Sequence, residues 1–229
     1  MDMAAIVAQN VTKTFHEGRT AVDVLRGVSL SVAPGEVVAL EGPSGSGKTT
    51  LLSILGCILT PTGGAVSIDG QEVDARKPSR LAAIRKRSIG FVFQQYNLFA
   101  SLTALENVEL ALNIKGTRGP KARCAAERAL DDVDLSDRKN FLPRDMSGGQ
   151  KQRVAIARAL VGSPTVLLAD EPTANVDSRV GQAILDLFRA LAKRDERALL
   201  IVTHDPQVRS VTDRVLTIRD GLLTTEHGV

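Results

Sequence analysis

The sequence predicts an α/β protein with a mainly parallel sheet core, an N-terminal antiparallel β part and an inserted α-helical subdomain. Residues 37–40 form a continuous apolar run, which is typical of a strand buried in a parallel sheet. Residues 165–203 alternate strand, helix and strand, and this alternation implies a sheet covered on both faces. Residues 98–145 have helical periodicity instead, so we interpret them as a helical insertion.

The individual elements follow from periodicity and from the turn residues between them. Residues 4–40 are β-rich because short apolar or alternating runs are separated by turn residues. The expected strands are residues 5–7, 22–24, 28–32, 37–40, 63–69, 89–93, 165–169, 198–203 and 215–218. The expected helices are residues 48–55, 102–112, 122–133, 150–161 and 180–193. We treat residues 1–229 as a single domain, with the helical subdomain at about residues 95–160.

Composition excludes several classes of protein. The 229 residues include 29 basic and 26 acidic ones, and this weak net charge of +3 argues against nucleic acid as a partner. Aromatic residues make up only 3%, too few for a row of base-stacking rings. The two cysteines have no metal-like spacing, which favours free thiols. We expect neither a signal peptide nor a membrane span, because the longest apolar runs are far shorter than roughly 18 residues.

A Gly-rich loop stands between an expected strand and an expected helix. Its sequence fits G-x-x-x-x-G-K-[ST], in which glycines let successive backbone N–H groups point at phosphate oxygens and the helix adds its N-terminal dipole. Lys48 can reach the β- and γ-phosphates, and the Thr49 hydroxyl can ligate Mg²⁺. We therefore expect a P-loop NTPase that binds nucleotide through Gly42, Pro43, Ser44, Gly45, Ser46, Gly47, Lys48, Thr49 and Thr50.

Two carboxylates follow the apolar strand at residues 165–169. Asp170 stands where a P-loop protein places a second Mg²⁺ contact. Glu171 lies one residue further, where a carboxylate can polarise the attacking water as a general base.

A second anion-binding arrangement precedes the helix at residues 150–161. Small residues before a helix leave its first N–H groups free for an anion, although the same residues also serve as an ordinary helix cap. In a chain that already has a phosphate loop, this arrangement indicates a second ligand or a site that completes another subunit's nucleotide. The residues are Ser147, Gly148, Gly149 and Gln150.

Together, the phosphate loop, the acidic strand end and the segment before the helix at residues 150–161 resemble motifs of the ATP-binding cassette (ABC) ATPases. The segment MSGGQKQRVAIARAL is similar to the family's signature segment, and other motifs match in the same order along nearly the whole chain. Gln94 resembles the glutamine of the Q-loop, and His204 resembles the switch histidine. Phe15 falls where the family places an aromatic ring against adenine. The D-loop corresponds to Ala174, Asn175, Val176 and Asp177.

The resemblance implies an MgATP-driven dimer of two head-to-tail copies. The signature residues of one copy would close over the γ-phosphate held by the phosphate loop of the other. Glu171 would activate water, and His204 would hold the water and the γ-phosphate. Lys48 and Gln94 complete the catalytic set that the resemblance implies. Mg²⁺ would be held by Thr49, Gln94 and Asp170.

The resemblance further implies a transport ATPase that works with a separate permease subunit at the cytoplasmic face of the cell (inner) membrane. Residues 96–102 would receive a short helix of that partner, unless Leu98, Phe99 and Leu102 are core of the helical subdomain.

The short motifs look most like the lipoprotein-release and macrolide-efflux subgroup, with importer ATPases as the near alternative. A soluble ABC ATPase of DNA repair, chromosome organisation or translation is the rival hypothesis. A P-loop kinase or GTPase fits the signature segment poorly. The cargo is not encoded in these motifs.

Overall fold

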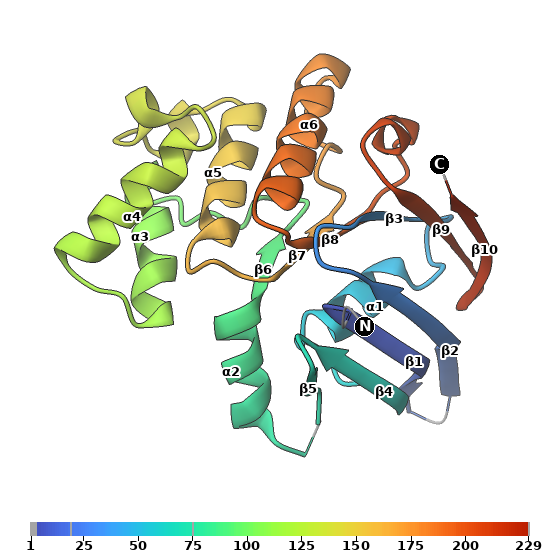
Figure 1. The fold of residues 1–229 in the computed structure, drawn as a ribbon. Coiled ribbons are helices and arrows are strands. Elements are labelled where there is room, and N and C mark those ends of the chain that lie inside the picture. Colours follow the sequence, from blue (N-terminus) through green and yellow to red (C-terminus); the bar gives the residue numbers. More distant parts are fainter. Residues whose placement is uncertain (1–3, 19, 75, 229) are drawn as a thin grey trace.

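The computed structural model describes residues 4–18, 20–74 and 76–228. It arranges them as two sheets with helices around the larger one (Figure 1). The N-terminal sheet and the C-terminal hairpin lie on one side of the molecule, and helices α3 to α5 lie on the other. This confirms the predicted fold class.

The smaller sheet is antiparallel, with strand order β2-β1-β4-β5. Its strands are β1 (Ile6–Glu17), β2 (Thr20–Val32), β4 (Gly63–Ile68) and β5 (Gln71–Glu72). The predicted break between residues 24 and 28 is wrong, because β2 is one continuous strand. It is bulged at Gly27 (φ 96°), where the partners of β1 shift from Val28 to Arg26.

The larger sheet has the order β10-β9-β3-β8-β7-β6, and every pair except β10–β9 is parallel. Strands β3 (Val37–Glu41), β7 (Val166–Asp170) and β8 (Ala198–Val202) form its centre, flanked by β6 (Ile89–Val92) and β9 (Arg214–Arg219). The central strands are buried on both faces, which explains their continuous apolar sequence. Parallel strands place their carboxyl ends at one edge, where loops from different strands meet.

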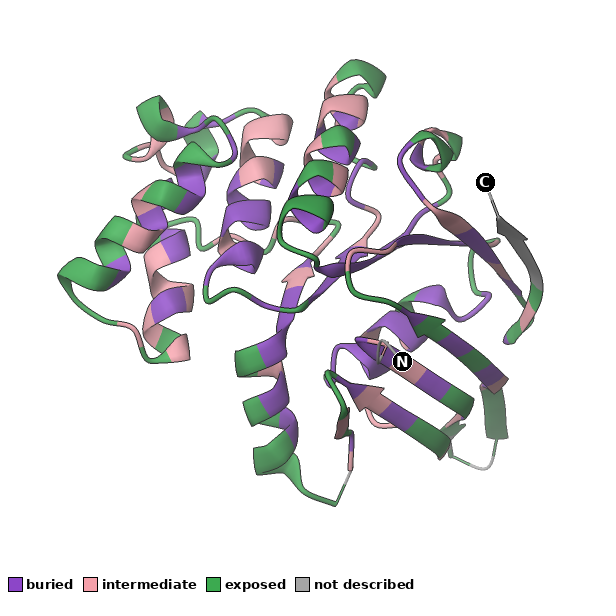
Figure 2. Ribbon diagram, viewed as in Figure 1, coloured by how far each residue is buried: buried purple, intermediate pink, exposed green. Residues whose placement is uncertain are grey.

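Two hydrophobic cores lie on opposite faces of this sheet. Alternate residues of β3 point to different cores: Val37 and Ala39 join one, Val38 and Leu40 the other. The first core packs against α5 (Gly148–Leu160) and α6 (Ser178–Arg194), and the second packs against α1 (Lys48–Leu55) and the antiparallel sheet. In Figure 2 the central strands are largely purple, whereas the helices around them alternate purple with pink and green, as expected of helices with one buried side.

The helical part comprises α3 (Ala104–Lys115), α4 (Pro120–Asp131), two short 3₁₀ turns (Ser136–Arg138 and Pro143–Asp145) and α5. Thr103 caps α3 in a reciprocal capping box with Glu106, and Pro120 occupies the first turn of α4. Leu105, Val108 and Leu112 are buried, as their helical spacing predicts.

Several elements were not predicted from the sequence. Helix α2 (Pro78–Ser88) was missed because it is strongly basic and only Leu81, Ile84 and Ser88 are buried. Strand β10 (Leu222–Gly228) pairs with β9 at the sheet edge, and the 3₁₀ turn Pro206–Ser210 precedes β9.

Within the described ranges, none of the helices is both long and apolar enough to cross a membrane.

Candidate nucleotide site

The phosphate loop joins β3 to α1 in a conformation that requires glycine. Gly47, at the N-cap of α1, has φ 104°, and a Cβ atom there would lie 2.9 Å from the carbonyl oxygen of Val24. At Gly42 a Cβ atom would lie 2.2 Å from the carbonyl oxygen of Ile218. Both contacts are with backbone, which cannot move aside easily, so a side chain at either position would distort the loop.

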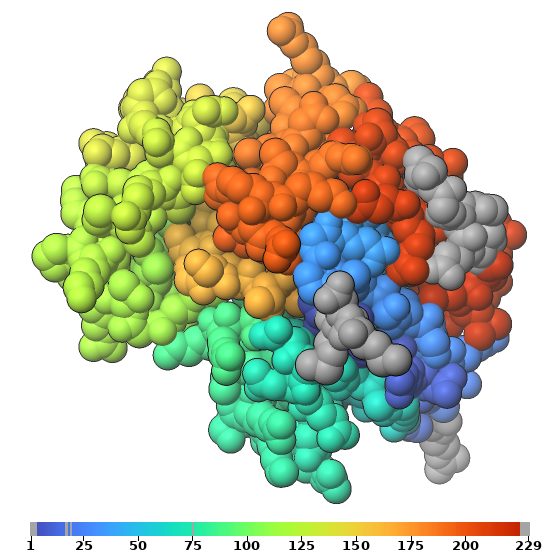
Figure 3. All heavy atoms as spheres, in the orientation of Figure 1, coloured from blue at the N-terminus to red at the C-terminus, as the bar shows by residue number. Residues whose placement is uncertain are grey.

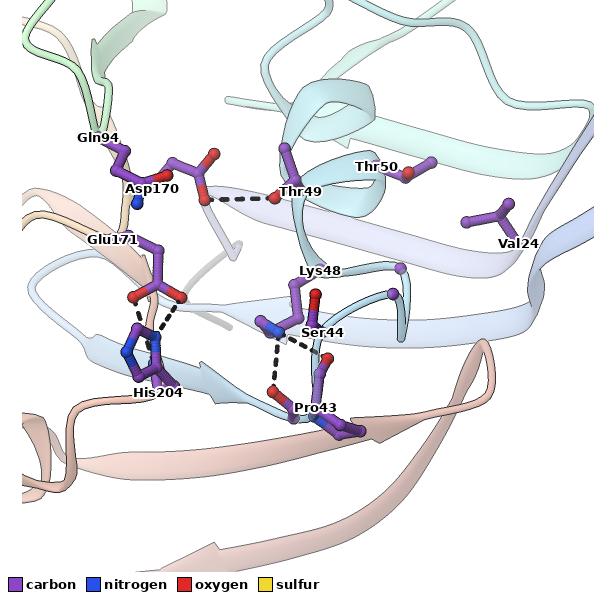
Figure 4. Close-up of a pocket in the computed structure, with 13 residues that line it drawn as sticks. Val24, Pro43, Ser44, Lys48, Thr49, Thr50, Gln94, Asp170, Glu171 and His204 are labelled. Carbon is purple, nitrogen blue, oxygen red and sulfur yellow. Dashed lines mark hydrogen bonds and ion pairs between the residues drawn. The ribbon is translucent and has the colours of Figure 1, made fainter. Parts of the chain in front are cut away.

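Lys48 is the first residue of α1 and its side chain turns back into the loop. Its Nζ donates to the carbonyl oxygens of Gly42 (2.8 Å) and Pro43 (2.9 Å), as Figure 4 shows. The residue is only 9% exposed. The ammonium group is therefore held at the centre of the loop, where it adds positive charge to the N-terminal end of a helix.

An open cleft of about 710 Å³ lies over the loop and extends to the carboxyl ends of β6, β7 and β8. It brings together most of the predicted nucleotide-binding and catalytic residues, together with one residue of β2 that the sequence did not indicate. Ser46 is buried instead and does not line the cleft, and its buried hydroxyl has no hydrogen-bond partner among the described residues. The lining residues are Val24, Gly42, Pro43, Ser44, Gly45, Gly47, Lys48, Thr49, Thr50, Gln94, Asp170, Glu171 and His204.

Asp170 ends β7 opposite the start of α1. The Thr49 hydroxyl donates to its Oδ1 over 3.4 Å. Burial raises the pKa of Asp170, and the adjacent Glu171 carboxylate raises it further, whereas Thr49 and Lys48 oppose the increase. A bound cation would therefore offset the cost of holding the Asp170 carboxylate ionised in a buried position beside Glu171. Hydroxyl and carboxylate oxygens are ligands that Mg²⁺ prefers, so the donor set fits that ion.

Glu171 and His204 form a pair at the mouth of the cleft. Oε1 of Glu171 lies 2.9 Å from Nδ1 of His204, and Oε2 accepts from the backbone N–H of His204 over 3.3 Å. Glu171 has a left-handed backbone (φ 46°), and its own N–H donates to Val202 on β8. A non-glycine residue in this conformation at a functional site indicates that local geometry is being imposed on the carboxylate.

The residues after β6 and β7 contact each other beside the cleft. The Asn175 side-chain amide donates to the carbonyl oxygen of Gln94 over 2.7 Å. The carbonyl oxygen of Asn175 accepts from the Tyr96 hydroxyl over 3.4 Å. Two motifs that lie far apart in the sequence, the predicted Q-loop and D-loop, are therefore linked next to Asp170 and Glu171.

The predicted second anion site lies in a hollow of its own, of about 530 Å³. Ser147 caps α5 by accepting from the N–H of Gln150, whose side chain accepts from the N–H of Ser147. Asp177 contributes to the same hollow and caps α6 by accepting from Val180. Within one chain, the hollow and the phosphate cleft share no lining residue.

Phe15 lies outside the residues that line the phosphate cleft. It is 39% exposed and pairs directly with Val22 across the β1–β2 ladder. The Lys13 ammonium lies 4.9 Å from the centre of its ring. Phe15 is therefore a surface ring rather than a core residue, on the sheet that contributes Val24 to the cleft.

The segment after Gln94 presents one aromatic ring outward. Phe99 is 55% exposed, whereas Leu98 packs against the core of the helical part, so the alternative core interpretation holds for Leu98 and fails for Phe99. Leu102 is half-buried and is not part of that core. The buried Asn107 side chain holds the segment by accepting from the Phe99 N–H and donating to the carbonyl oxygens of Phe99, Leu102 and Thr103.

Two further contacts were not predicted. The Thr173 hydroxyl donates to Oδ2 of Asp205 over 3.0 Å, joining the segment after Glu171 to the segment after His204. Arg158 of α5 donates to the carbonyl oxygens of Tyr96 and Asn97. The only sequence signal for the first contact is that each residue lies near a predicted site residue.

The fold and the phosphate loop define a P-loop nucleotide-binding protein. The family model described as "ABC transporter" matches residues 25–174, and the chain belongs to this family of ATP-hydrolysing cassettes.

Three comparisons define its relationships within the family. The lipoprotein-releasing system ATP-binding protein LolD of Porphyromonas gingivalis is 43% identical, over 96% of this chain and 99% of that protein. The macrolide export ATP-binding/permease protein MacB of Syntrophobacter fumaroxidans is 45% identical over 99% of this chain, which covers 32% of that longer protein. A dimeric, post-hydrolysis structure of the cassette MJ0796 bound to ADP and Pi superposes with a TM-score of 0.90 at 42% identity. That match covers 97% of this chain and 98% of the other.

The comparisons confirm the resemblance read from the sequence. They give no support to the rival hypothesis of DNA repair, chromosome organisation or translation, because LolD is named for a lipoprotein-releasing system and MacB for macrolide export.

Proposed function

We propose that the chain hydrolyses MgATP between two head-to-tail copies and so drives a separate membrane permease. The proposal of ATP hydrolysis rests on the contact between Glu171 and His204 at the mouth of the phosphate cleft, beside Asp170. The dimeric MJ0796 structure supports the two-copy arrangement, and the permease portion in the name of MacB supports the membrane partner.

The phosphate loop would bind the triphosphate through its backbone N–H groups and Lys48. Phosphate oxygens would compete with the carbonyl oxygens of Gly42 and Pro43 for the Lys48 ammonium, which already lies within the loop. Adenine would lie toward the antiparallel sheet, against the exposed ring of Phe15. The side chain of Val24, in the cleft lining, would contact the nucleotide between these two points.

Mg²⁺ would be held by Thr49 and Asp170, with Gln94 in the same cleft. When bound, the ion would neutralise charge on the β- and γ-phosphates. Its charge would also favour the ionised form of Asp170, whose pKa is raised by burial in the protein alone.

Glu171 would accept a proton from the attacking water. Its carboxylate is held by two hydrogen bonds from His204, one from the ring and one from the backbone, when the ring nitrogen Nδ1 is protonated. The carboxylate is only 14% exposed, and partial burial strengthens such contacts. The His204 ring is 72% exposed, so it can reach the γ-phosphate from the same position.

The signature residues would act in trans. Ser147, Gly148 and Gly149 surround the N-terminus of α5, which lies in a hollow apart from the phosphate cleft of its own chain. A second copy would bring this helix end against the γ-phosphate, where free N–H groups and the helix dipole favour negative charge. The D-loop residues Ala174–Asp177 would also contact the second copy, since Asn175 bonds to Gln94 at the phosphate cleft and Asp177 lines the second hollow.

The permease would dock at the segment that exposes Phe99, since buried Asn107 holds that segment in a fixed shape. We place the chain at the cytoplasmic face of the inner membrane through this contact. LolD and MacB support the lipoprotein-release and macrolide-export subgroup, in which the cargo would be selected by the membrane subunit.

A steady-state ATPase assay with Lys48→Ala tests the phosphate-loop assignment. We expect turnover to fall by at least roughly 100-fold, because the positive charge at the β/γ-phosphates is lost. Lys121→Ala, at an exposed lysine of α4, is the matched control and should retain activity. Unchanged turnover in Lys48→Ala would contradict the proposal.

A further inference from the structure

Helix α2 and the turn between α3 and α4 form a surface with an excess of positive charge. Residues 69–88 contain six of the 29 basic residues and three of the 26 acidic ones. The rest of the chain therefore has 23 of each and no net charge. The whole net charge of +3 therefore resides in one short segment. Residues 75–105 and 110–126 contain no acidic residue at all.

The fold brings these two acid-free segments together. Helix α2 contacts α3, and a Cβ atom on Gly116, at the end of α3, would lie 3.7 Å from Nζ of Lys86. Figure 1 shows the C-terminal end of α2 beside that of α3, and Figure 3 shows the α2 segment projecting from the lower edge of the molecule. We call this surface the basic face; it comprises Arg80, Lys86 and Arg87 of α2 with Arg118 and Lys121 of the α3–α4 region.

The five side chains of the basic face are exposed, and none of them makes an ion pair or a hydrogen bond with a residue that the structure describes. This contrasts with Arg76 and Lys77, which both pair with Asp74. The face is thus a set of uncompensated cations on a helix and the adjoining turn. Such a set produces a positive potential that extends about a Debye length, roughly 10 Å at 0.1 M salt.

Helix electrostatics explains only part of this pattern. Arg85, Lys86 and Arg87 occupy the last turn of α2, where the helix dipole favours cations. Arg80 lies near the N-terminus of α2, where the dipole disfavours a cation, and the first turn has no acidic residue. A helix with basic residues at both ends is therefore not optimised for its own stability, which points to an external anion.

The surroundings of the charges favour a lipid surface as that anion. The exposed residues between the cations on α2 are Ala82 and Ala83, whose small side chains allow close approach. Ile114, which is 66% exposed, lies two residues before Gly116 on the α3 side. Long basic side chains around an exposed apolar one are typical of interfacial binding. Single-stranded nucleic acid is disfavoured by the scarcity of aromatic residues.

We propose that the basic face binds anionic phospholipid headgroups, so that the chain contacts the membrane directly as well as through its permease. This rests on the proposed membrane role only for its biological setting, because the contact requires neither nucleotide nor the permease. Each basic residue near an anionic membrane contributes about a fivefold increase in partition coefficient.

Co-sedimentation of the full chain with phosphatidylcholine vesicles, with and without phosphatidylglycerol, tests the proposal. We expect binding to the anionic vesicles only, and weaker binding as salt is raised because exposed charges are screened. The triple variant Arg80→Gln, Lys86→Gln, Arg87→Gln should bind about 100-fold less tightly. The control triple variant Arg26→Gln, Arg144→Gln, Arg219→Gln removes the same charge from other surfaces and should bind like the wild type.

Basal ATPase activity of both triple variants, which we expect to be unchanged, verifies folding. Equal vesicle binding by the basic-face variant and the wild type would overturn the proposal. Equal loss in the two triple variants would also overturn it, since net charge alone would then explain binding. Preference for a DNA duplex over anionic vesicles would identify nucleic acid instead. Loss of permease co-purification without any vesicle binding would identify an acidic protein segment. None of these outcomes alters the Lys48→Ala result, which tests the ATPase separately.

Discussion

Nδ1 of His204 lies 2.9 Å from Oε1 of Glu171, although the two residues are 33 positions apart in the sequence. They follow the neighbouring parallel strands β7 and β8, whose pairing extends to Asp170 and Val202. The backbone N–H of Glu171 donates to Val202, which fixes the carboxylate beside the end of β8. The proposed catalytic pair is thus positioned by sheet register rather than by a local loop.

Glu171→Gln should retain ATP binding, lose hydrolysis and accumulate as an ATP-bound dimer. The amide has nearly the shape of the carboxylate but cannot accept the proton of water, and a general base contributes about 10²- to 10⁴-fold to the rate. Size-exclusion chromatography with ATP and a turnover assay measure the two effects. The matched control is Glu196→Gln, at an exposed carboxylate. A strictly monomeric Glu171→Gln chain would contradict the dimer.

Ser147→Asp should abolish turnover, whereas Ser147→Asn should retain it. Both side chains cap a helix well, so α5 remains capped, but only aspartate brings negative charge toward the γ-phosphate of the second copy. Turnover assays of the two variants, with circular dichroism to verify folding, make this comparison. Equal activity of the two variants would exclude a phosphate contact at Ser147.

Mixing inactive chains tests whether the signature acts in trans. A dimer of one Lys48→Ala chain and one Ser147→Asp chain has one intact composite site, and random pairing gives about a quarter of the wild-type sites. We expect the mixture to recover measurable turnover, while each variant alone remains inactive. No recovery despite proven mixed dimers would mean that the signature does not complete the partner's site.

Phe99→Glu should prevent co-purification with the permease and leave nucleotide binding intact. The ring is exposed and Asn107 accepts from the Phe99 backbone N–H, so the substitution adds charge to a surface without opening a cavity or removing that hydrogen bond. Leu222→Glu, at a position 44% exposed on β10, is the control. Pull-down with the membrane subunit gives the readout, and retained co-purification in Phe99→Glu would reject this docking surface.

Thr173→Val should lower kcat about tenfold with little change in KM. The Thr173 hydroxyl donates to Asp205, and hydrogen bonds to charged groups contribute about 1.5–3 kcal/mol. Without this bond, the segment that holds His204 would lose one of its links to the segment after Glu171. Thr173→Ser should restore kcat because it retains the hydroxyl. A change confined to thermal stability, with kcat unaltered, would assign Thr173 a purely structural role.

Much of the fold and of the candidate site was predictable from local pattern. The apolar strands, the helices with regular spacing and the Gly-rich loop all depend on residues close together in the sequence, and these gave the α/β class, the phosphate loop and the acidic strand end. Helix α2 was not predictable in this way, since its exposed face is almost entirely basic or alanine and its apolar signal is only two residues. Strand β10 depends on pairing with β9 at an edge, which periodicity does not reveal.

The sequence by itself determined which chemical groups are present: the phosphate-binding loop, the paired carboxylates, the small residues before α5 and the histidine after β8. Only the tertiary structure decided which of these groups meet. Parallel pairing of β7 with β8 brings Glu171 to His204, while the signature residues of the same chain lie in a separate hollow. Likewise, a net charge of +3 gave no sign of a charged surface, because the average over the whole chain conceals charges that the packing of α2 against α3 concentrates on one face. The physical reason is that contacts between distant residues depend on strand order and helix packing, which local sequence patterns do not specify.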